Sequence, residues 1–293
     1  MSVAPAPGGH EVRTYVDLKS LNRVGARQGF LDYLVSIWRY RHFVLYDSRF
    51  RVGSANSQEK LGNAWIILSP LLNGLTFFLI FGLLLKTGKG IENFIGYLII
   101  GVFLFQMSSR AISAGAQAIR ANKTVIQAFN FPRATLLAAI NVRELLSNIP
   151  VVITMIVMIL VLPPTEAITW RILLIPPVLA LQFIFNLGVG LLLARLVHHF
   201  NDLGQLISFV MRLWLYGSAV FFSIDRFESV PVIQQIMEVN PLFIVLDISR
   251  DSLLYATTPS WESWATLAVW ALGAIVVGLV FFWREEERYG RDS

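Results

Sequence analysis

The sequence lacks cysteine and carries little charge. It contains 0 cysteines among 293 residues, and the charged residues make up 15% of the chain against 55% hydrophobic residues. Without cysteine, disulfides, thiolate metal sites and cysteine nucleophiles are excluded. A soluble domain of this length would carry about a quarter charged residues, and the mean hydropathy here is +0.61. The composition therefore indicates an integral membrane protein.

Catalytic and nucleotide-binding motifs are also missing. Gly82–Gly90 has the composition of a phosphate-binding loop but not the G-x-x-x-x-G-K-[ST] spacing. There is no H-E-x-x-H, no G-x-S-x-G and no pair of carboxylates inside an apolar run. His198 and His199 are neighbours in sequence, and adjacent residues on a helix do not converge on one ion. We therefore expect no metal, no cofactor and no enzymatic activity in this chain itself, so energy for any work must come from a partner.

The segment Phe30–Val52 precedes the first long apolar run and combines apolar residues at helical spacing with arginine and aromatic residues. This pattern is typical of a helix that lies in the plane of the membrane interface. Because the cytoplasmic leaflet is the anionic one, we expect it on the cytosolic side. An anchor without a mechanical role remains an alternative interpretation.

Apolar runs predict an all-α fold with six transmembrane helices. Each run is long enough to cross about 30 Å of hydrocarbon. The predicted spans are residues 61–85, 93–119, 134–162, 172–194, 205–223 and 263–283. Residues 1–29 are expected to be a disordered cytosolic tail because they are rich in Pro, Ala and Gly, and residues 284–293 form a second, charged tail.

The distribution of Lys and Arg sets the orientation. With the N-terminus inside, most of the basic residues fall on the cytosolic side, and the other side holds Lys86, Lys89, Arg171, Arg226 and Arg250. The positive-inside rule then places both termini in the cytosol of a multi-pass protein. The same clustering at the ends of apolar runs explains the net charge of +5 without a nucleic-acid partner. No internal repeat supports an inverted-repeat carrier.

Residues 224–262 form a connection that is too long for a turn and too apolar for a solvated loop. Val230–Met237 and Pro241–Leu254 predict two short amphipathic helices, the second capped by Asn240. Such helices dip into a membrane only where protein or water satisfies their backbone. We predict a re-entrant external gate, with candidate residues Pro231, Ile236, Asn240 and Pro241.

Arg110, Arg143, Glu144 and Arg212 lie inside apolar runs, where an ionised side chain is costly unless it is paired or hydrated. The many aromatic side chains either face lipid or offer stacking surfaces for sugars. The candidates for lining a transport path are Phe77, Phe81, Phe103, Phe105, Arg110, Trp214, Tyr216, Phe221 and Phe222.

Several short motifs occur in order within this frame. They are Leu61–Trp65, Ser69-Pro70, Asn130–Arg133, Asn201–Leu203, Asn240-Pro241, Ser249–Asp251 and Glu287–Tyr289. Together they resemble the transmembrane subunits of ABC transporters that export lipid-linked polysaccharides. The chain departs from that pattern at Asn201, where the family commonly has Arg, and at Asp47 and Phe50, where a more basic run is expected.

The resemblance implies a homodimeric permease in the bacterial inner membrane, joined by two copies of an ATP-binding subunit that holds ATP and magnesium. It also implies a tunnel for a polyprenyl-diphosphate-linked polysaccharide, in contact with membrane lipids. The cytosolic segment 120–133 would couple to the ATPase through Asn122, Lys123, Gln127, Ala128, Phe129, Phe131 and Arg133. Arg39, Arg41, Arg49 and Arg51 would steer the lipid diphosphate to the entrance.

Three alternatives stay open. A drug- or lipid-exporting permease of the same superfamily shares these features. A membrane-embedded acyl- or glycosyltransferase would require His and Asp constellations that the sequence does not contain. A stand-alone channel would not co-purify with an ATPase.

Overall fold

The computed structural model describes residues 29–54, 60–84, 91–129, 131–164, 166, 169–200, 202–227 and 229–290. These residues form helices joined by short connections, and no strand occurs within them. The predicted all-α class is therefore confirmed. The predicted N-terminal tail lies outside the described residues, apart from Gly29.

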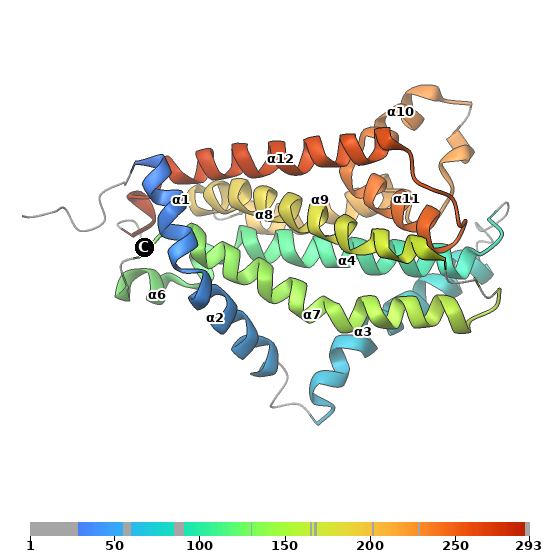
Figure 1. Cartoon of the computed structure of the whole chain (residues 1–293), viewed down its shortest axis with the longest axis horizontal. Coiled ribbons are helices and arrows are strands. Elements are labelled where there is room, and N and C mark those ends of the chain that lie inside the picture. The colour runs from blue at the N-terminus through green and yellow to red at the C-terminus, as the bar shows by residue number, and fades with distance from the viewer. Residues whose placement is uncertain are drawn as a thin grey trace, which may run out of the picture.

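Four of the described helices are long and apolar enough to cross a membrane. They are α4 (Phe94–Ala116), α7 (Ala134–Val161), α8 (Ile175–His199, preceded by the 3-10 turn Trp170–Leu174) and α12 (Trp261–Trp283). In Figure 1 the four run roughly along the long axis of the molecule. The most apolar part of α4 is 78% buried, against 22–33% for the other three. Helix α4 is therefore the centre of the bundle, and α7, α8 and α12 present much more of their surface to the outside.

Two of the six predicted spans are shorter in the structure. The first is α3 (Trp65–Phe77), which continues as a wider π-helix over Phe78–Leu84, and the fifth is α9 (Leu203–Gly217). The α-helical parts are 13 and 15 residues long, shorter than the roughly 20 residues that a helix needs to cross the hydrocarbon. The fifth run ends early because the chain unwinds after Gly217 and turns through Ala219 at φ 49. Hydrophobicity continues to Phe222, so apolar composition alone overestimated the length of α9.

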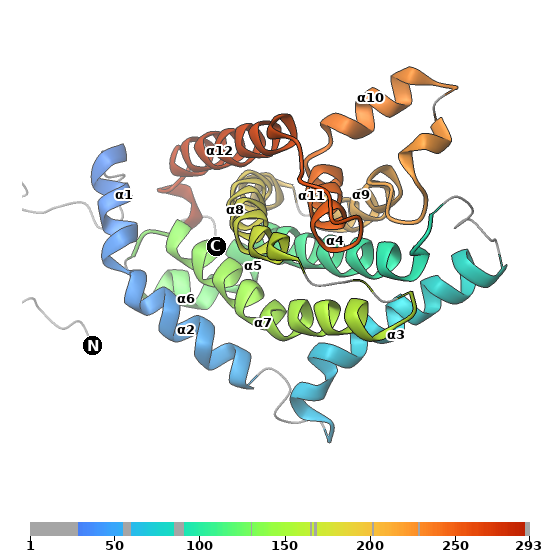
Figure 2. The same cartoon turned by 45° about the vertical axis from the view of Figure 1, so that its right-hand side comes forward.

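The two short helices predicted for the external gate are present, with ends displaced by at most two residues; we call them and the bend between them the gate region, after the role predicted from the sequence. Helices α10 (Pro231–Val239) and α11 (Pro241–Leu253) meet at an angle of 84°. The side chain of Asn240 accepts a hydrogen bond from the backbone N–H of Leu242 at 3.1 Å, which makes Asn240 the N-cap of α11. Figure 2 shows α10 projecting from the bundle, whereas α11 packs against α4, α8 and α12. By length and composition the pair is either one broken span or a re-entrant loop.

The interfacial segment is two helices rather than one. Helix α1 (Phe30–Arg39) and α2 (Arg41–Ser54) are separated at Tyr40, whose backbone N–H is shared between the carbonyls of Ser36 and Ile37. This tightened turn redirects the chain along the side of the bundle (Figure 2). On the inner face Tyr33, Val44 and Ser48 are buried. The prediction of a single helix over residues 30–52 was wrong. At the break, the ring of Tyr40 lies beside that of Phe131, with centroids 6.4 Å apart.

A close approach of backbones joins α8 to α12. A Cβ atom placed on Gly188 would collide with the backbone of Ala274, and one placed on Gly278 would collide with the carbonyl of Gly188. Only glycine fits at such a crossing. Small residues at a helix crossing are the usual means of packing helices in a membrane. This contact holds α12 on the side of α8 away from α7 (Figure 1).

Candidate functional site

The segment predicted to couple to an ATPase lies at one end of the molecule, beside α1 and the C-terminal residues; we call this the terminal end (Figure 1). It consists of α5 (Ala118–Ala121), α6 (Lys123–Ala128) and the extended residue Phe129. Lys123, Gln127, Ala128 and Phe129 are exposed, and the Phe129 side chain is 66% exposed. A large aromatic side chain this exposed next to a short helix is a shape that suits a partner's cleft.

The other members of the predicted coupling set face inward. Asn122 is half-buried and donates a hydrogen bond to the carbonyl of Ala118 at 2.9 Å. Phe131 is buried between the rings of Tyr40 and Phe43, with centroid distances of 6.4 and 6.2 Å. Arg133 is also buried. The segment therefore has one exposed surface and one surface that is anchored to the interfacial helices.

Arg133 belongs to a buried polar cluster that the sequence did not reveal. The backbone N–H of Arg133 donates to Glu286 Oε1 at 2.8 Å, and its guanidinium lies 3.4 Å from the same oxygen. The hydroxyl of Tyr33 donates to Glu286 Oε2 at 2.8 Å and accepts from the backbone N–H of Ala134 at 3.2 Å. We call Tyr33, Arg133 and Glu286 the terminal cluster. It joins α1, the start of α7 and the residues after α12.

Burial dominates the electrostatics of this cluster. Desolvation raises the pKa of Glu286 above its usual range, although the hydrogen bonds from Arg133 and Tyr33 oppose the shift. Desolvation, with the nearby Glu286 carboxyl adding to it, also raises the pKa of Tyr33. The Tyr33 hydroxyl therefore stays protonated and available as a donor.

The chain after α12 is held against α8 by further contacts. Arg195 donates to the carbonyl of Phe281 at 2.6 Å and to Glu285 Oε1 at 2.9 Å. The ring of Tyr289 stacks on Phe282 with centroids 4.5 Å apart, and its hydroxyl donates to the carbonyl of Phe282. Residues 284–290, predicted as a cytosolic tail, are thus packed in place.

The four arginines predicted at the entrance are exposed. Arg41 lies over the ring of Trp38 at 5.3 Å, and Arg51 binds both carboxylate oxygens of Asp47 at 2.8 and 2.9 Å. Arg39 and Arg49 also lie on α1 and α2. A cavity of about 310 Å³ opens beside Arg51 between α2, α5 and α7. Its polar lining comes from Asp47, Arg51, Gln117, Asn122 and Arg143.

A second cavity, of about 200 Å³, lies between α3, α4 and α9. Two of the residues predicted to line the transport path, Phe77 and Phe105, line this cavity. Its uncharged polar side chains are Gln106, Ser109, Ser113 and Ser208. Arg212 also lines it, and Arg110 follows Ser109 on α4 with an exposed side chain bonded to Gln106 at 3.2 Å. Aromatic rings, hydroxyls and guanidinium groups therefore share one face.

The remaining predicted path residues are distributed differently. Phe103 and Phe221 are buried in the core around α4. Tyr216 is exposed, Phe222 is half-buried against Phe227 at a centroid distance of 5.4 Å, and Phe81 lies outside the described side chains. The indole N–H of Trp214 donates to Asn240 Oδ1 at 2.9 Å. Trp214 thus contributes to the gate region rather than to the second cavity.

Asn240 organises the gate region. Besides capping α11 and accepting from Trp214, its amide donates to the carbonyl of Gly217 and the hydroxyl of Ser218, both at 3.0 Å. Pro241 is buried, whereas Pro231 and Ile236 are exposed on α10. One side chain therefore ties the bend between α10 and α11 to the end of α9.

A second buried cluster, also missed from the sequence, lies next to this bend. Arg250 of α11 is 2% exposed, stacks on the ring of Tyr97 at 3.3 Å, and donates to the carbonyl of Ala219 at 3.1 Å. The hydroxyl of Tyr97 donates to the carbonyls of Ala219 and Phe222 at 2.9 and 2.7 Å. We call Tyr97 and Arg250 the gate clasp. The motif Ser249–Asp251 was noted in the sequence, and Arg250 was counted on the external side, within the predicted helix Pro241–Leu254, but its burial was not predicted.

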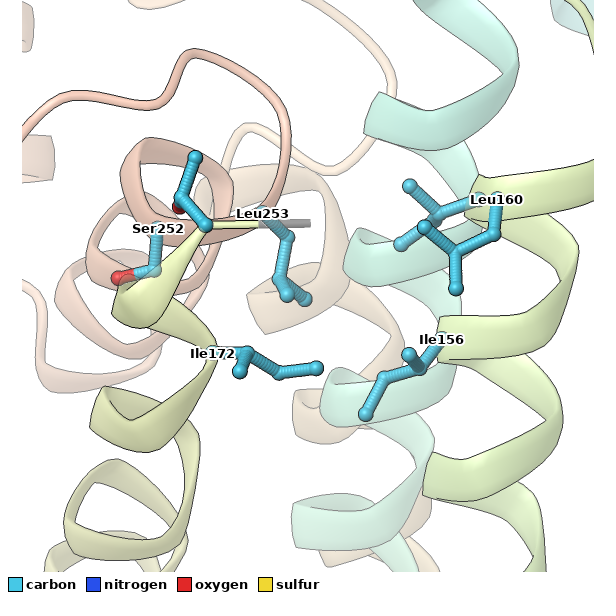
Figure 3. A pocket seen from close by; sticks show the side chains of 7 residues that line it. Ile156, Leu160, Ile172, Ser252 and Leu253 are labelled. Atoms are coloured by element: carbon cyan, nitrogen blue, oxygen red, sulfur yellow. The ribbon is translucent and has the colours of Figure 1, made fainter. Parts of the chain in front are cut away.

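Neither a metal centre nor a further ligand site is evident in the part of the chain described. No group of three potential metal ligands occurs among the described residues. Figure 3 shows a cavity between α7, the turn before α8 and α11, lined mainly by apolar side chains such as Ile156, Leu160 and Ile172. At about 20 Å³ it holds no more than one water molecule.

Comparison with known proteins identifies relatives along most of the chain. Residues 52–254 match the family described as ABC-2 type transporter. An O-antigen export system permease protein of Myxococcus xanthus is 24% identical over 195 residues, which is 67% of this chain and 73% of the relative. One from Klebsiella pneumoniae is 27% identical over 232 residues, 78% of this chain and 86% of the relative. A polysialic acid transport protein of Escherichia coli is 24% identical over 274 residues, 89% of this chain and 98% of the relative.

Proposed function

The chain belongs to the ABC-2 type transporter family, and we propose that it is the permease subunit that exports a polyprenyl-diphosphate-linked polysaccharide, driven by a separate ATP-binding subunit. The observation that carries this proposal is the family match together with relatives named for O-antigen and polysialic acid export. The sequence has no phosphate-binding loop of the Walker type. ATP and magnesium would therefore be bound by the partner.

We place the ATP-binding subunit at the terminal end, against the exposed surface of α6 and Phe129. The amphipathic helices α1 and α2 lie at the same end. Their outer face carries large exposed apolar side chains, including Leu31, Trp38 and Tyr46 at 75%, 70% and 80% exposure. Such a face suits the headgroup region of a membrane. The arginines of the same helices would attract the diphosphate of the substrate, and both termini would lie in the cytosol of a bacterium.

The transport path would form between two copies of this chain. In one copy Arg110 and Arg212 are exposed within apolar helices, where contact with lipid would be costly unless water or a second protein surface covers them. The second cavity offers rings for stacking sugars and hydroxyls for hydrogen bonding beside these cations. A homodimer that joins two such faces would enclose a polar conduit. In this arrangement α3 and α9, extended by their neighbours, would complete six spans.

Substitution of Phe129 tests the coupling. In the complex of this chain with its ATP-binding subunit, reconstituted in lipid vesicles, Phe129→Ala should lower export and substrate-stimulated ATP hydrolysis by roughly ten-fold or more, as expected for an interface anchor. Phe200→Ala is the matched control, because Phe200 is also exposed, at 63%, and follows α8. Equal export by the Phe129 and Phe200 variants would refute the assigned docking surface. Export by the purified chain without any ATPase would refute the proposed function.

A further inference from the structure

The terminal cluster connects three parts of the chain that are far apart in sequence. Tyr33 and Glu286 are 253 residues apart, and Arg133 and Glu286 are 153 residues apart. Arg133 and Glu286 are 8% and 4% exposed, and Tyr33 is 2% exposed. Hydrogen bonds that are buried this deeply do not exchange with water without a cost. The three segments therefore move together or the cluster must open.

The cluster also completes the N-terminus of α7. The first backbone N–H groups of a helix have no partner within the helix, and Arg133 offers no side-chain cap of its own. Here Glu286 accepts from the N–H of Arg133, and the hydroxyl of Tyr33 accepts from the N–H of Ala134. A carboxyl group at this position also interacts favourably with the helix dipole. Helix α7 is thus capped by residues from α1 and from the segment after α12.

The position of this cap matters because α7 follows the proposed coupling segment directly. Phe131, two residues before Arg133, is held by Tyr40 and Phe43 of the interfacial segment. Ser48 of α2 donates to the carbonyl of Ala139, further along α7, at 2.8 Å. The contacts at Phe131 and Ser48 are made by α2 and by the turn before it, whereas α1 reaches the start of α7 through the hydroxyl of Tyr33.

We infer that the Tyr33 hydroxyl, held by Glu286, is a positioning group that makes α1 move with the coupling segment and α7 when the partner subunit binds ATP. This inference rests on the proposed function. Tyr33 contacts neither nucleotide nor transported lipid; it acts through the start of α7. A displacement of α6 moves α1 and α7 together. Tyr33 of α1 and Arg133 at the start of α7 are both hydrogen-bonded to the carboxyl group of Glu286.

The test measures distance changes directly. The chain has no native cysteine, so spin labels can be placed on Leu31→Cys of α1 and Thr124→Cys of α6, both exposed, in a complex with a cysteine-free ATP-binding subunit. Samples that carry each label alone identify the distances between the two copies of the proposed homodimer and leave the distance between α1 and α6. In the complex with the ATP-binding subunit, the wild-type background should keep one narrow distance distribution with and without ATP plus vanadate. Tyr33→Phe, which removes a single oxygen atom, should give a shifted or broadened distribution on trapping. It should also lower export per ATP by about five-fold, the size of a modest coupling change.

Tyr46→Phe is the control, since Tyr46 loses the same oxygen atom from an exposed position on α2. It should behave as the wild type in both measurements. A Tyr33→Phe complex with wild-type distances after trapping, or with wild-type export per ATP, overturns the inference. If the wild-type complex exports no lipid-linked polysaccharide, the proposed function fails, while the distance measurement still decides whether α1 follows α6.

Discussion

The two buried polar clusters stabilise opposite ends of the molecule by different means. In the terminal cluster the carboxyl group of Glu286 accepts hydrogen bonds from a hydroxyl and a backbone N–H and forms an ion pair with the guanidinium of Arg133. In the gate clasp no carboxylate of the described residues forms an ion pair with Arg250, and its guanidinium donates to carbonyls and stacks on a ring. Both sites are almost fully buried. The terminal cluster resembles a helix cap. The gate clasp supplies hydrogen bonds to backbone carbonyls that have no partner within a helix.

The difference follows from the local backbone. At the terminal end α7 begins and exposes N–H donors, so an acceptor is required. At the gate α9 has ended, and Ala219, Val220 and Phe221 are buried in a segment that is not helical. Its carbonyls require donors, because irregular backbone at membrane depth must be satisfied by protein or water. Arginine carries five donors and no acceptor, which explains why a cation is buried there without a carboxylate.

Arg250→Ala should have the largest effect, because it truncates a fully buried side chain, removes the cation stacked on Tyr97 and leaves the Ala219 carbonyl with only the hydroxyl of Tyr97 as a donor among the hydrogen bonds of the clasp. We expect a loss of about 3–5 kcal/mol in the free energy of unfolding in detergent, the size expected for truncating a large buried side chain together with the loss of its hydrogen bonds. Thermal unfolding monitored by circular dichroism measures the change. Arg226→Ala, at an exposed position near the gate, should leave the unfolding temperature unchanged. A similar small change in both variants would show that the clasp is dispensable.

Asn240→Ala should lower the free energy of unfolding by less than Arg250→Ala, and it acts on the same gate region. It removes the cap of α11 and leaves the indole N–H of Trp214 and the carbonyl of Gly217 without this partner. Loss of a cap costs about 1 kcal/mol and loss of the partly buried hydrogen bond from Trp214 about 1 kcal/mol, so a loss of about 2 kcal/mol is expected. Hydrogen exchange should rise in α11 and at the end of α9 but not at the terminal end. Exchange that rises equally at both ends would contradict the separation of the two clusters.

The smallest effect is the contribution of Glu286, at the terminal end, to the pH dependence of stability. Because burial raises the pKa of Glu286, the folded state binds a proton more tightly than the unfolded state. The stability from this group is therefore present below the ordinary carboxyl pKa and is lost as pH rises through the raised pKa. Glu286→Gln cannot titrate, so its unfolding temperature should fall less with rising pH than that of the wild type. Glu238→Gln, at an exposed position on α10, should keep the wild-type slope; parallel slopes in all three proteins would contradict the prediction.

Several elements could be predicted from sequence because a local signal specifies them. Asn240 before Pro241 predicts a helix start, and the structure confirms it. The four long apolar runs predict spans that the structure contains, with ends displaced by a few residues. The break at Tyr40 and the early end of α9 could not be predicted, since both depend on contacts with distant residues, Phe131 and Asn240.

The sequence by itself determined that this is a membrane protein, that it is helical and that it has no nucleotide site of the Walker type. The apolar composition indicates the first two properties, and the spacing of motif residues indicates the third. Only the tertiary structure decided which charges are buried. From the sequence, Arg250 was predicted on the external side and Glu286 in a charged cytosolic tail, yet both are buried in hydrogen-bonded clusters. The physical reason is that a backbone group without a partner arises from where helices end and meet, and the side chain that satisfies it can come from anywhere in the chain.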